Sequence, residues 1–391
     1  MASRWFQPPS LRIDGDLGRE RRTGWLELFY DLILVAAVSQ LSLHLAQHMT
    51  VVGLLGFVLL FVPIWWSWIG ATFYHDRFEA DDVGHRLIIF ALMAANANVA
   101  AHVPTALTTN PAGFALAYVG LRLIICFMWG RGGYYSPVAR PLTHRYLVGF
   151  GLAILLWLVS TQVAGPVRFG LWALASLIEV ATPLFTFQAQ AHLPRLSQSH
   201  LPERFGLLTL IVLGESVVAA TNGVAGQAVT RTAAVAGLLA LGFSFCLWWL
   251  YFDNIMGRRL KRGMRMVATW VYGHLGLAMA LTALGAALLT LIRHAAEPAV
   301  PTGLRWLVCG ATAMALFALG LLDTATDTPV TDEHMRWLAS MGAMGALLIA
   351  LMGGGLSSWA LITWLLALGV ALVIGDLVAR PVGAATESPF G

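Results

Sequence analysis

Two acidic residues, Glu27 and Asp31, lie four positions apart inside an apolar run that begins near position 25. On a helix this spacing puts both carboxylates on one face, one turn apart, where they repel each other. Such a pair favours a bound proton or cation, or else a structural ion pair with Arg21, Arg22 or an arginine of a loop. An ionisable group in an apolar run is costly unless it is paired or hydrated, so the pair is a candidate ion site.

Three more charged residues lie near the middle of other apolar runs. Glu215 follows Glu203 by twelve residues, about 18 Å along a helix, and Gly214 would let a neighbouring helix approach closely. Arg122 and Glu179 occupy similar depths in two further runs. Pairing of Arg122 with Glu215 or Glu179 would explain how these charges are tolerated. Such a pair either binds substrate or only holds helices together.

A densely charged segment, 74–86, follows the second apolar run. It reads Tyr-His-Asp-Arg-Phe-Glu-Ala-Asp-Asp-Val-Gly-His-Arg, with four acids, two arginines and two histidines. Two interpretations are open, a cytoplasmic gate that attracts ions and an ordinary solvated loop. The gate interpretation depends on Asp81, Asp82, His85 and Arg86.

Another segment, which follows the apolar run 230–252, is purely basic. It contains Arg258, Arg259, Lys261 and Arg262. Basic residues beside a membrane span set its orientation and attract anionic lipid headgroups, and neither role needs a soluble substrate. We therefore expect membrane lipids as partners here, in addition to an unidentified small solute or ion elsewhere.

The composition of the chain indicates a membrane protein. Apolar residues make up 58% of the 391 residues and charged residues 11%, and the mean hydropathy is +0.73, outside the range of soluble domains. A membrane-spanning helix needs about 20 apolar residues, so the length allows about a dozen. The predicted fold is an all-α, polytopic transmembrane bundle. Its expected spans are 25–47, 51–74, 87–108, 111–130, 145–165, 167–189, 204–222, 230–252, 268–292, 303–322, 337–355 and 359–378.

The basic residues predict the orientation of the bundle. Of the 24 Lys and Arg, nineteen fall on the side of the N-terminus, four on the other side and one, Arg122, within a span. The four are Arg168, Arg231, Arg293 and Arg305. Because cytoplasmic loops carry the excess of Lys and Arg, both termini should be cytoplasmic. As topology signals in loops, these residues give no reason to expect a nucleic-acid partner.

An internal repeat is also indicated. The runs that open at Glu27 and Glu203 both start with Glu-x-Phe, and the second and eighth spans both end in a cluster with paired tryptophans. Six spans per half is an even number, so the halves would be parallel repeats. The predicted organisation is a cytoplasmic segment 1–24, a first half 25–189, a linker 190–203, a second half 204–378 and a cytoplasmic tail 379–391.

The remaining motifs predict neither a cofactor nor a metal site. His44, His48 and His102 have no acid or cysteine beside them and are interpreted as interfacial histidines. Aromatic belts at helix ends are the expected place for Trp65, Trp66, Trp68, Trp248 and Trp249. No phosphate-binding loop, dinucleotide fingerprint, zinc-protease motif or serine-hydrolase elbow occurs in a suitable context. An ATP-driven pump is not expected, and an enzyme is the less favoured class.

Four motifs occur in a specific order over residues 20–378. They are Glu27-Leu-Phe29-Tyr-Asp31-Leu, Arg77-Phe-Glu-Ala-Asp81-Asp82 through His85-Arg86, Glu203-Arg-Phe205-Gly with Gly214-Glu215, and Trp248-Trp249-Leu-Tyr251-Phe-Asp253. In these motifs the chain resembles the bacterial low temperature requirement A (LtrA) family, which often has Phe in place of Tyr30 and Asp in place of Glu79. The resemblance implies a multi-pass protein of the bacterial cytoplasmic membrane, linked by name to growth in the cold, and supplies no substrate.

Three hypotheses for function follow. The first, which we favour, is a secondary transporter or ion pathway coupled to protons or cations, with the intramembrane charges named above lining a path between the halves. The second is a membrane-embedded lipid-handling protein or enzyme that uses Asp81, Asp82 and His85 at headgroup level. The third is a membrane scaffold, in which matched apolar residues would replace the intramembrane charges without loss.

Overall fold

Helices make up most of the chain in a computed structural model of the protein. The structure describes residues 5–12, 24–80, 82–194, 196–197, 200–225, 230–256, 258–327 and 333–379. Its helices are α1 (Trp25–Gln47), α2 (Val51–Arg77), α3 (Val83–His102), α4 (Pro111–Tyr135), α5 (Arg140–Ser160), α6 (Pro166–Ala181), α7 (Phe187–Ala191), α8 (His200–Ala225), α9 (Arg231–Asn254), α10 (Met264–Arg293), α11 (Thr302–Ala325), α12 (His334–Met352) and α13 (Ser358–Ala379). Short 3₁₀ turns occupy Val103–Thr105 and Leu184–Thr186, and two short strands are β1 (Ser10–Leu11) and β2 (Phe78–Glu79).

The described part of the chain contains twelve spans that are long and apolar enough to cross a membrane, with α6 and α7 together forming one of them. The predicted all-α class and number of spans are therefore confirmed, while the repeat and the orientation stay predictions. Several helices run further than the apolar pattern indicates. Thus α2 ends at Arg77 rather than near position 74, and α8 begins at His200 rather than position 204. Polar side chains at both ends are buried with partners, which allows the helices to continue.

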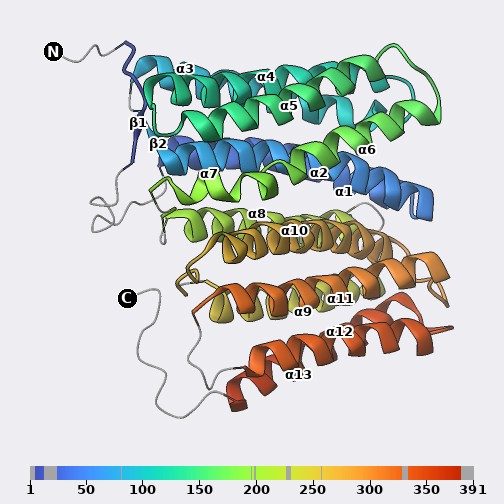
Figure 1. The fold of residues 1–391 in the computed structure, drawn as a ribbon. Coiled ribbons are helices and arrows are strands. Elements are labelled where there is room, and N and C mark those ends of the chain that lie inside the picture. Colours follow the sequence, from blue (N-terminus) through green and yellow to red (C-terminus); the bar gives the residue numbers. More distant parts are fainter. Residues whose placement is uncertain are drawn as a thin grey trace. The chain divides into compact units, whose positions relative to one another are not determined.

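The chain divides into two compact units, one of Met1–His44 with Leu55–Arg204 and one of Leu45–Leu54 with Phe205–Gly391. In the first unit, α3, α4, α5 and α6 pack one against the next in chain order, as Figure 1 shows in teal and green. Strand β1 pairs antiparallel with β2, so Ser10 lies opposite Glu79. The limits of the two predicted halves stay a prediction.

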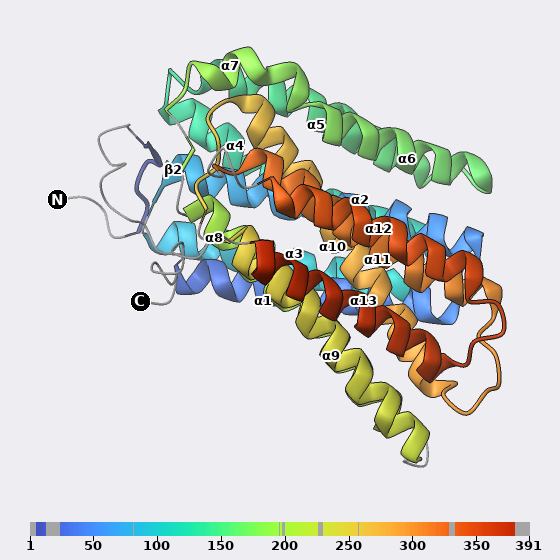
Figure 2. The ribbon, with the colours of Figure 1, turned by 90° about the horizontal axis from the view of Figure 1, so that it is seen from below.

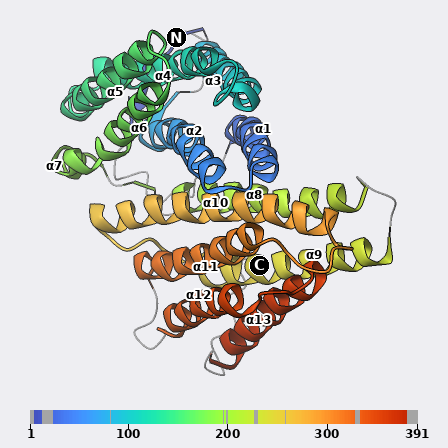
Figure 3. The same cartoon turned by 90° about the vertical axis from the view of Figure 1, so that its right-hand side faces the viewer.

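The second unit has its own serial packing. Helices α10, α11, α12 and α13 each pack against the next, and α9 packs against α13 and α10. Figure 3 shows α11, α12 and α13 following one another in this order, and Figure 2 shows α12 and α13, in orange and red, beside each other. Helix α10 is the most enclosed of the twelve spans. Within its apolar segment 83% of the residues are buried inside the protein, against 28% for α12. Its many alanines and glycines allow neighbouring helices to come close on several sides.

Buried aromatic rings fill the interior of the first unit between α4, α5 and α6. The ring centroid of Trp157 lies 4.7 Å from that of Tyr118 and 5.0 Å from that of Trp172. Trp172 donates its indole N–H to Ser160 Oγ at 2.8 Å. Offset aromatic contacts of this kind add to the stability from area burial alone, so the cluster fixes the register of the three helices.

The tryptophans of α2 lie inside the protein. Trp65, Trp66 and Trp68 are at most 3% exposed and precede the last turns of a helix that continues to Arg77. The assignment of these three to an aromatic belt is therefore wrong, because their rings are enclosed by protein and Trp68 donates a hydrogen bond within it. For Trp248 and Trp249, half-buried near the end of α9, the assignment stays a prediction.

The close contact between α4 and α5 requires a glycine at position 133. A Cβ atom built there would lie 2.0 Å from Thr143 Oγ1 and 2.9 Å from Thr143 Cβ. Thr143 is β-branched and buried, so it cannot rotate away freely. We expect Gly133→Ala to lower the free energy of unfolding in detergent by about 1–3 kcal/mol. Gly120→Ala on the same helix is the control, since a Cβ atom there meets open space; equal effects of both changes would contradict the expectation.

Candidate functional site

Six buried side chains from α1, α2 and α8 meet near the ends of these helices in the first unit. We call them the His200 cluster: Glu27, Asp31, Trp68, Asp76, His200 and Arg204. Each is at most 8% exposed. Of these, Glu27 and Asp31 are predicted site residues, and the other four come from positions that the sequence did not single out.

His200 lies between two carboxylates. Its Nε2 atom is 2.7 Å from Glu27 Oε2, and its Nδ1 atom is 3.2 Å from Asp76 Oδ1. A neutral imidazole has one N–H and one acceptor nitrogen, so it can donate to only one of the two acids. Both contacts are hydrogen bonds when the ring is charged, or when one carboxyl group carries the proton. The trio thus has a place for at least one exchangeable proton.

Arg204 is the cation that balances the acids of α1. Its Nη2 atom lies 2.6 Å from Asp31 Oδ1, and its Nη1 atom lies 3.8 Å from Glu27 Oε2. Trp68 donates its indole N–H to the same Asp31 oxygen at 2.7 Å. A structural ion pair is therefore present, but its arginine is on α8. Arg21 and Arg22, the partners first considered, lie outside the described residues.

The His200 cluster carries more negative than positive charge. Glu27, Asp31 and Asp76 are three acids, Arg204 is one permanent cation, and buried Arg77 interacts electrostatically with Asp76 as a second. Among these described residues the balance is one negative charge with a neutral His200 and none with a charged His200. His75, next to Asp76 in sequence, also acts electrostatically on Glu27. Excess negative charge in a buried site favours uptake of a proton or another cation.

A separate ion pair joins α4 and α6 near the middle of their spans. Arg122 Nε lies 2.9 Å from Glu179 Oε1, and both side chains are fully buried. Tyr118 donates its hydroxyl to Glu179 Oε2 at 2.5 Å. The guanidinium carbon of Arg122 lies 4.3 Å from the centre of the Phe150 ring on α5. Of the two partners that the sequence offered for Arg122, the structure pairs it with Glu179.

Glu215 is buried on α8, in the second unit. Its backbone and Cβ lie about 3.5 Å from the place where a Cβ of Gly285 on α10 would stand, so Gly285 permits the close approach of these helices. A Cβ at Gly214 would meet open space. The role predicted for Gly214 in close packing is therefore wrong. Glu215 follows Arg204 by eleven residues, about three turns, so both project from the same face of α8.

The charged segment 74–86 is mostly helical. His75, Asp76 and Arg77 are at most 5% exposed in the last turn of α2, and Arg77 donates to the carbonyl of Pro194 at 2.9 Å. A solvated loop is thus the wrong description of these three residues. Among the proposed gate residues, Asp81 lies outside the described residues. His85 is half-buried and Arg86 is exposed in the first turn of α3.

Asp82 caps the N-terminus of α3. Its carboxylate accepts the N–H of His85 at 2.9 Å and the N–H of Gln7 at 3.1 Å. Arg131 lies 4.0 Å away and also donates to the carbonyl of Gln7. These bonds tie the chain before α1 to α3 and α4, so the carboxylate of Asp82 is engaged in holding the fold.

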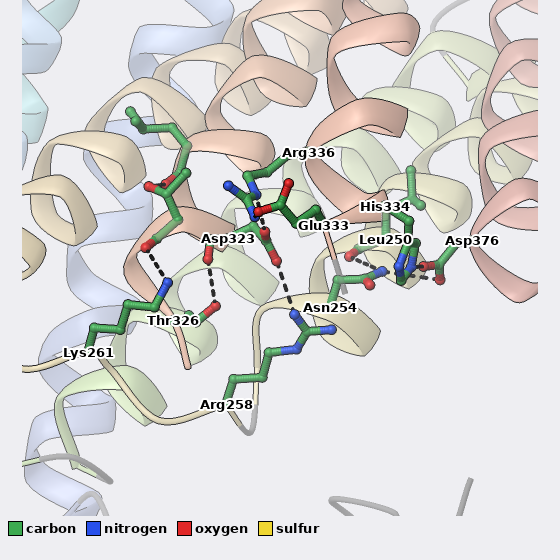
Figure 4. Close-up of polar contacts among 12 residues, drawn as sticks. Leu250, Asn254, Arg258, Lys261, Asp323, Thr326, Glu333, His334, Arg336 and Asp376 are labelled. Atoms are coloured by element: carbon green, nitrogen blue, oxygen red, sulfur yellow. Dashed lines mark hydrogen bonds and ion pairs between the residues drawn. The ribbon is translucent and has the colours of Figure 1, made fainter. Parts of the chain in front are cut away.

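The second unit has an ion cluster at the ends of α9, α11, α12 and α13. Arg258 lies 3.0 Å and Arg336 3.3 Å from the fully buried Asp323, and both point toward it in Figure 4. Glu333 binds Arg336 at 2.8 Å. The two cations and two acids that the structure describes here balance one another.

Asp376 holds the last turn of α13 to two other helices. It lies 2.9 Å from His334 Nε2 at the start of α12 and accepts from Asn254 Nδ2 at the end of α9 at 3.2 Å (Figure 4). Asp376 is thus in a helix-end contact. This arrangement closes one end of the second unit rather than forming a site in its interior.

Two of the four residues predicted to meet lipid headgroups bond inside the protein. Arg258 pairs with Asp323, and Lys261 donates to the carbonyl of Thr324 at 3.0 Å. Arg259 and Arg262 are exposed. Lipid contact stays a prediction for this segment and fits the exposed pair better.

Within the described residues, no group of three or more His, Cys, Asp or Glu has the arrangement needed to hold a metal ion. A family model described as Bacterial low temperature requirement A protein (LtrA) matches residues 22–375 of the chain. The match takes in all of the helices from α1 to α12 and most of α13. The chain belongs to the LtrA family. This LtrA family protein is thus a membrane-spanning protein of a bacterial family.

The LtrA family protein is also similar to the uncharacterized protein RA0937 of Rhizobium meliloti (strain 1021). The two are 26% identical over 248 residues. The aligned part is 60% of this chain and 59% of the relative, so the chain spans about three fifths of the relative that it matches.

Sequence reasoning missed His200, Asp76 and Trp68 in this LtrA family protein. His200 and Arg204 have the helical i,i+4 spacing, which was a usable signal, but both precede the apolar run of α8. Asp76 was one of four acids in a charged segment, with no feature that separated it from the others. Glu27, the common partner of His200 and Arg204, is 173 residues away from His200 in the chain.

The cap at Asp82 predicts a pH dependence for the stability of the LtrA family protein. Burial raises the pKa of this carboxyl, but the N–H groups of His85 and Gln7 and the charge of Arg131 outweigh burial and hold the pKa below its ordinary value. A pKa that is lower in the folded state stabilises the fold above about pH 4, and this stability is lost as the pH falls.

We therefore expect Asp82→Ala to lower the free energy of unfolding by about 1–2 kcal/mol near neutral pH. The loss should shrink on acidification. Thermal unfolding in detergent over a pH series measures it, with Glu79→Ala, an exposed neighbour, as control. A deficit that is constant down to about pH 3 would show that the charge of Asp82 contributes nothing.

Proposed function

We propose that this LtrA family protein is a proton-coupled secondary transporter of the bacterial plasma membrane, with the His200 cluster as its proton-accepting site. One observation carries the proposal: the two ring nitrogens of His200 face two different carboxylates, at 2.7 and 3.2 Å. An imidazole titrates near neutral pH, so small changes around it move a proton on or off. Sodium or potassium is the alternative cation for the same excess of negative charge.

The chemistry of the trio suits proton relay. His200 is within hydrogen-bond distance of Glu27 on one side and of Asp76 on the other. A proton gained at one carboxylate can therefore pass through the ring to the other. Arg204 pairs most closely with Asp31, at 2.6 Å, and lies 3.8 Å from Glu27 of the trio.

Arg122, Glu179 and Glu215 are proposed as further positions of the pathway. Arg122 and Glu179 lie near the middle of the spans Pro111–Tyr135 and Pro166–Ala191, and Glu215 lies near the middle of His200–Ala225. Ionisable groups at this depth face a protein interior or a hydrated path in most membrane proteins. The buried position of all three supports the proposal.

The other two hypotheses have less support. An enzyme or lipid-handling site would need free side chains at the headgroup level, yet Asp82 already accepts two backbone N–H groups. A scaffold needs balanced charges, as in the Asp323 cluster of the second unit. Among the described residues the charges of the His200 cluster and Arg77 balance only when the trio holds a proton, which favours a proton-binding role over a scaffold.

The test is a flux assay in liposomes that contain the purified protein and a pH-sensitive dye. We expect an imposed proton gradient to drive flux through the wild type, and both His200→Gln and Glu27→Gln to reduce it by at least about tenfold, equal to ~1.4 kcal/mol in the barrier. Glu297→Gln, which removes an acid that is 49% exposed, is the matched control and should leave flux unchanged.

The outcomes separate the hypotheses. Loss of flux in Glu215→Gln as well would add Glu215 to the residues that flux requires. Flux driven by sodium or potassium gradients but not by protons would change the coupling ion and keep the site. A folded wild type that moves none of these ions would refute the proposal and favour a scaffold.

We also propose that Arg259 and Arg262 contact anionic lipid headgroups, because both are exposed in a segment whose other two cations are paired. Each exposed cation near an anionic surface contributes about 1 kcal/mol. We expect Arg259→Gln with Arg262→Gln to weaken retention of anionic lipid by about tenfold or more, as measured by mass spectrometry of the detergent-released protein. Retention of the zwitterionic lipid is the internal control, and an equal loss of both lipids would contradict the charge argument.

A further inference from the structure

The guanidinium of Arg122 has one edge that meets no acceptor within the described part of the chain. Its Nε atom faces Glu179, whereas Nη1 and Nη2 have no hydrogen-bond partner among the described residues. The side chain is fully buried in the middle of α4. A buried guanidinium normally finds acceptors for all five of its N–H donors, because a buried donor without a hydrogen bond costs free energy. The Nη1 and Nη2 edge is therefore a strong donor pair with its bonding unmet.

The unmet edge is the one that recognises carboxylates. Two parallel N–H groups of an arginine fit the two oxygens of a carboxylate in a bidentate fork, whereas a spherical ion gains less from the same geometry. Glu179 binds at Nε, so a second carboxylate can bind end-on without displacing it. The guanidinium and its two bonds thus distinguish a planar carboxylate from other small anions.

The surroundings hold this fork in a fixed orientation. The ring of Phe150 covers one face of the guanidinium, with 4.3 Å from Cζ to the ring centre. On the side of α2, Gly70 has no side chain, and a Cβ there would stand 3.4 Å from Nη1 and 3.1 Å from Ile125 Cγ2. The glycine therefore lets the backbone of α2 approach the Nη1 side of the fork closely, and the aromatic ring packs against one face of the guanidinium.

Charge balance then links an anion to a proton. Arg122 and Glu179 sum to zero, so a bound carboxylate would leave one net negative charge in an apolar interior, which is costly. Protonation of Glu179 restores neutrality, and its Oε2 can keep the hydroxyl of Tyr118. Tyr118 and Cys126, on the same face of α4, and Tyr30 on α1 are the other titratable groups that interact electrostatically with Arg122 among the described residues. None of them is expected to be charged in this apolar setting, so Glu179 is the group that takes the proton.

We propose that Arg122 binds the carboxylate of a small organic anion, and that the anion binds together with one proton on Glu179. The role of Arg122 and Glu179 as a substrate site rests on the proposed transport function. In that function the cargo is a small carboxylate that crosses as a neutral combination of anion and proton. The binding step itself needs no transport and can be tested separately.

The experiment measures thermal unfolding of the purified full-length protein in detergent while sodium acetate replaces sodium chloride at constant ionic strength. A ligand that binds only the folded state raises the midpoint in a saturable way, which gives an apparent Kd. Acetamide, the neutral analogue, is the matched control probe and should have no effect. If one proton accompanies each anion, the apparent Kd for acetate should be up to about 100-fold lower at about pH 5.5 than at about pH 7.5.

Two variants test the assignment to residues. Glu179→Gln has the shape of the protonated acid, so it should bind acetate at about pH 7.5 as tightly as the wild type does at about pH 5.5, with no remaining pH dependence. Arg122→Lys keeps the charge and loses the fork, and should weaken acetate by about tenfold or more. Should the lysine variant fail to fold, Glu179→Gln still decides the question.

Three results would overturn the proposal. They are no stabilisation by acetate in either the wild type or Glu179→Gln, equal stabilisation by acetamide, and pH-dependent binding that Glu179→Gln leaves unchanged. The first would mean that water satisfies the fork and that the pair is structural. Proton flux that persists despite that result would leave the proposed function standing, whereas acetate binding without any flux would leave the site standing and refute transport.

Discussion

Charge pairing in an apolar interior is the constraint on which the rest of the first unit depends. A carboxylate or guanidinium without a partner there costs several kcal/mol, so each such residue requires a partner on another helix. Arg204 on α8 meets Asp31 on α1, and Arg122 on α4 meets Glu179 on α6. The helices cannot slide along one another without separating these charges. The ion pairs therefore fix the register that apolar packing alone would leave loose.

The two buried sites of the first unit satisfy this constraint in different ways. The His200 cluster lies near helix ends and has more acids than cations, so it gains from a proton or cation. The Arg122 and Glu179 pair lies at mid-span and is balanced, so it accepts further charge only in neutral combinations. Depth and charge balance together give the two sites different chemistry, although both use the same residue types.

The second unit uses ion pairs chiefly to close its helix ends. Asp323 is surrounded by Arg258 and Arg336, and Asp376 is held by His334 and Asn254, all near the ends of α9, α11, α12 and α13. The LtrA family match covers residues of both units. The ion clusters of the second unit therefore join helix ends, while the His200 cluster of the first unit is the candidate for proton chemistry.

Hydropathy by itself determined the helical class, the twelve spans and most of their bounds, because an apolar run of about 20 residues has a low free energy in only one environment. It also marked Glu27, Asp31, Arg122, Glu179 and Glu215 as unusual, since charge in such a run is costly. The tertiary structure decided which of them pair, and it brought in residues outside the apolar runs. The partners in the His200 cluster are up to 173 residues apart, and an ion pair depends on distance in space between helices. The type of a residue and its neighbours in the chain do not determine the distance in space between residues on different helices.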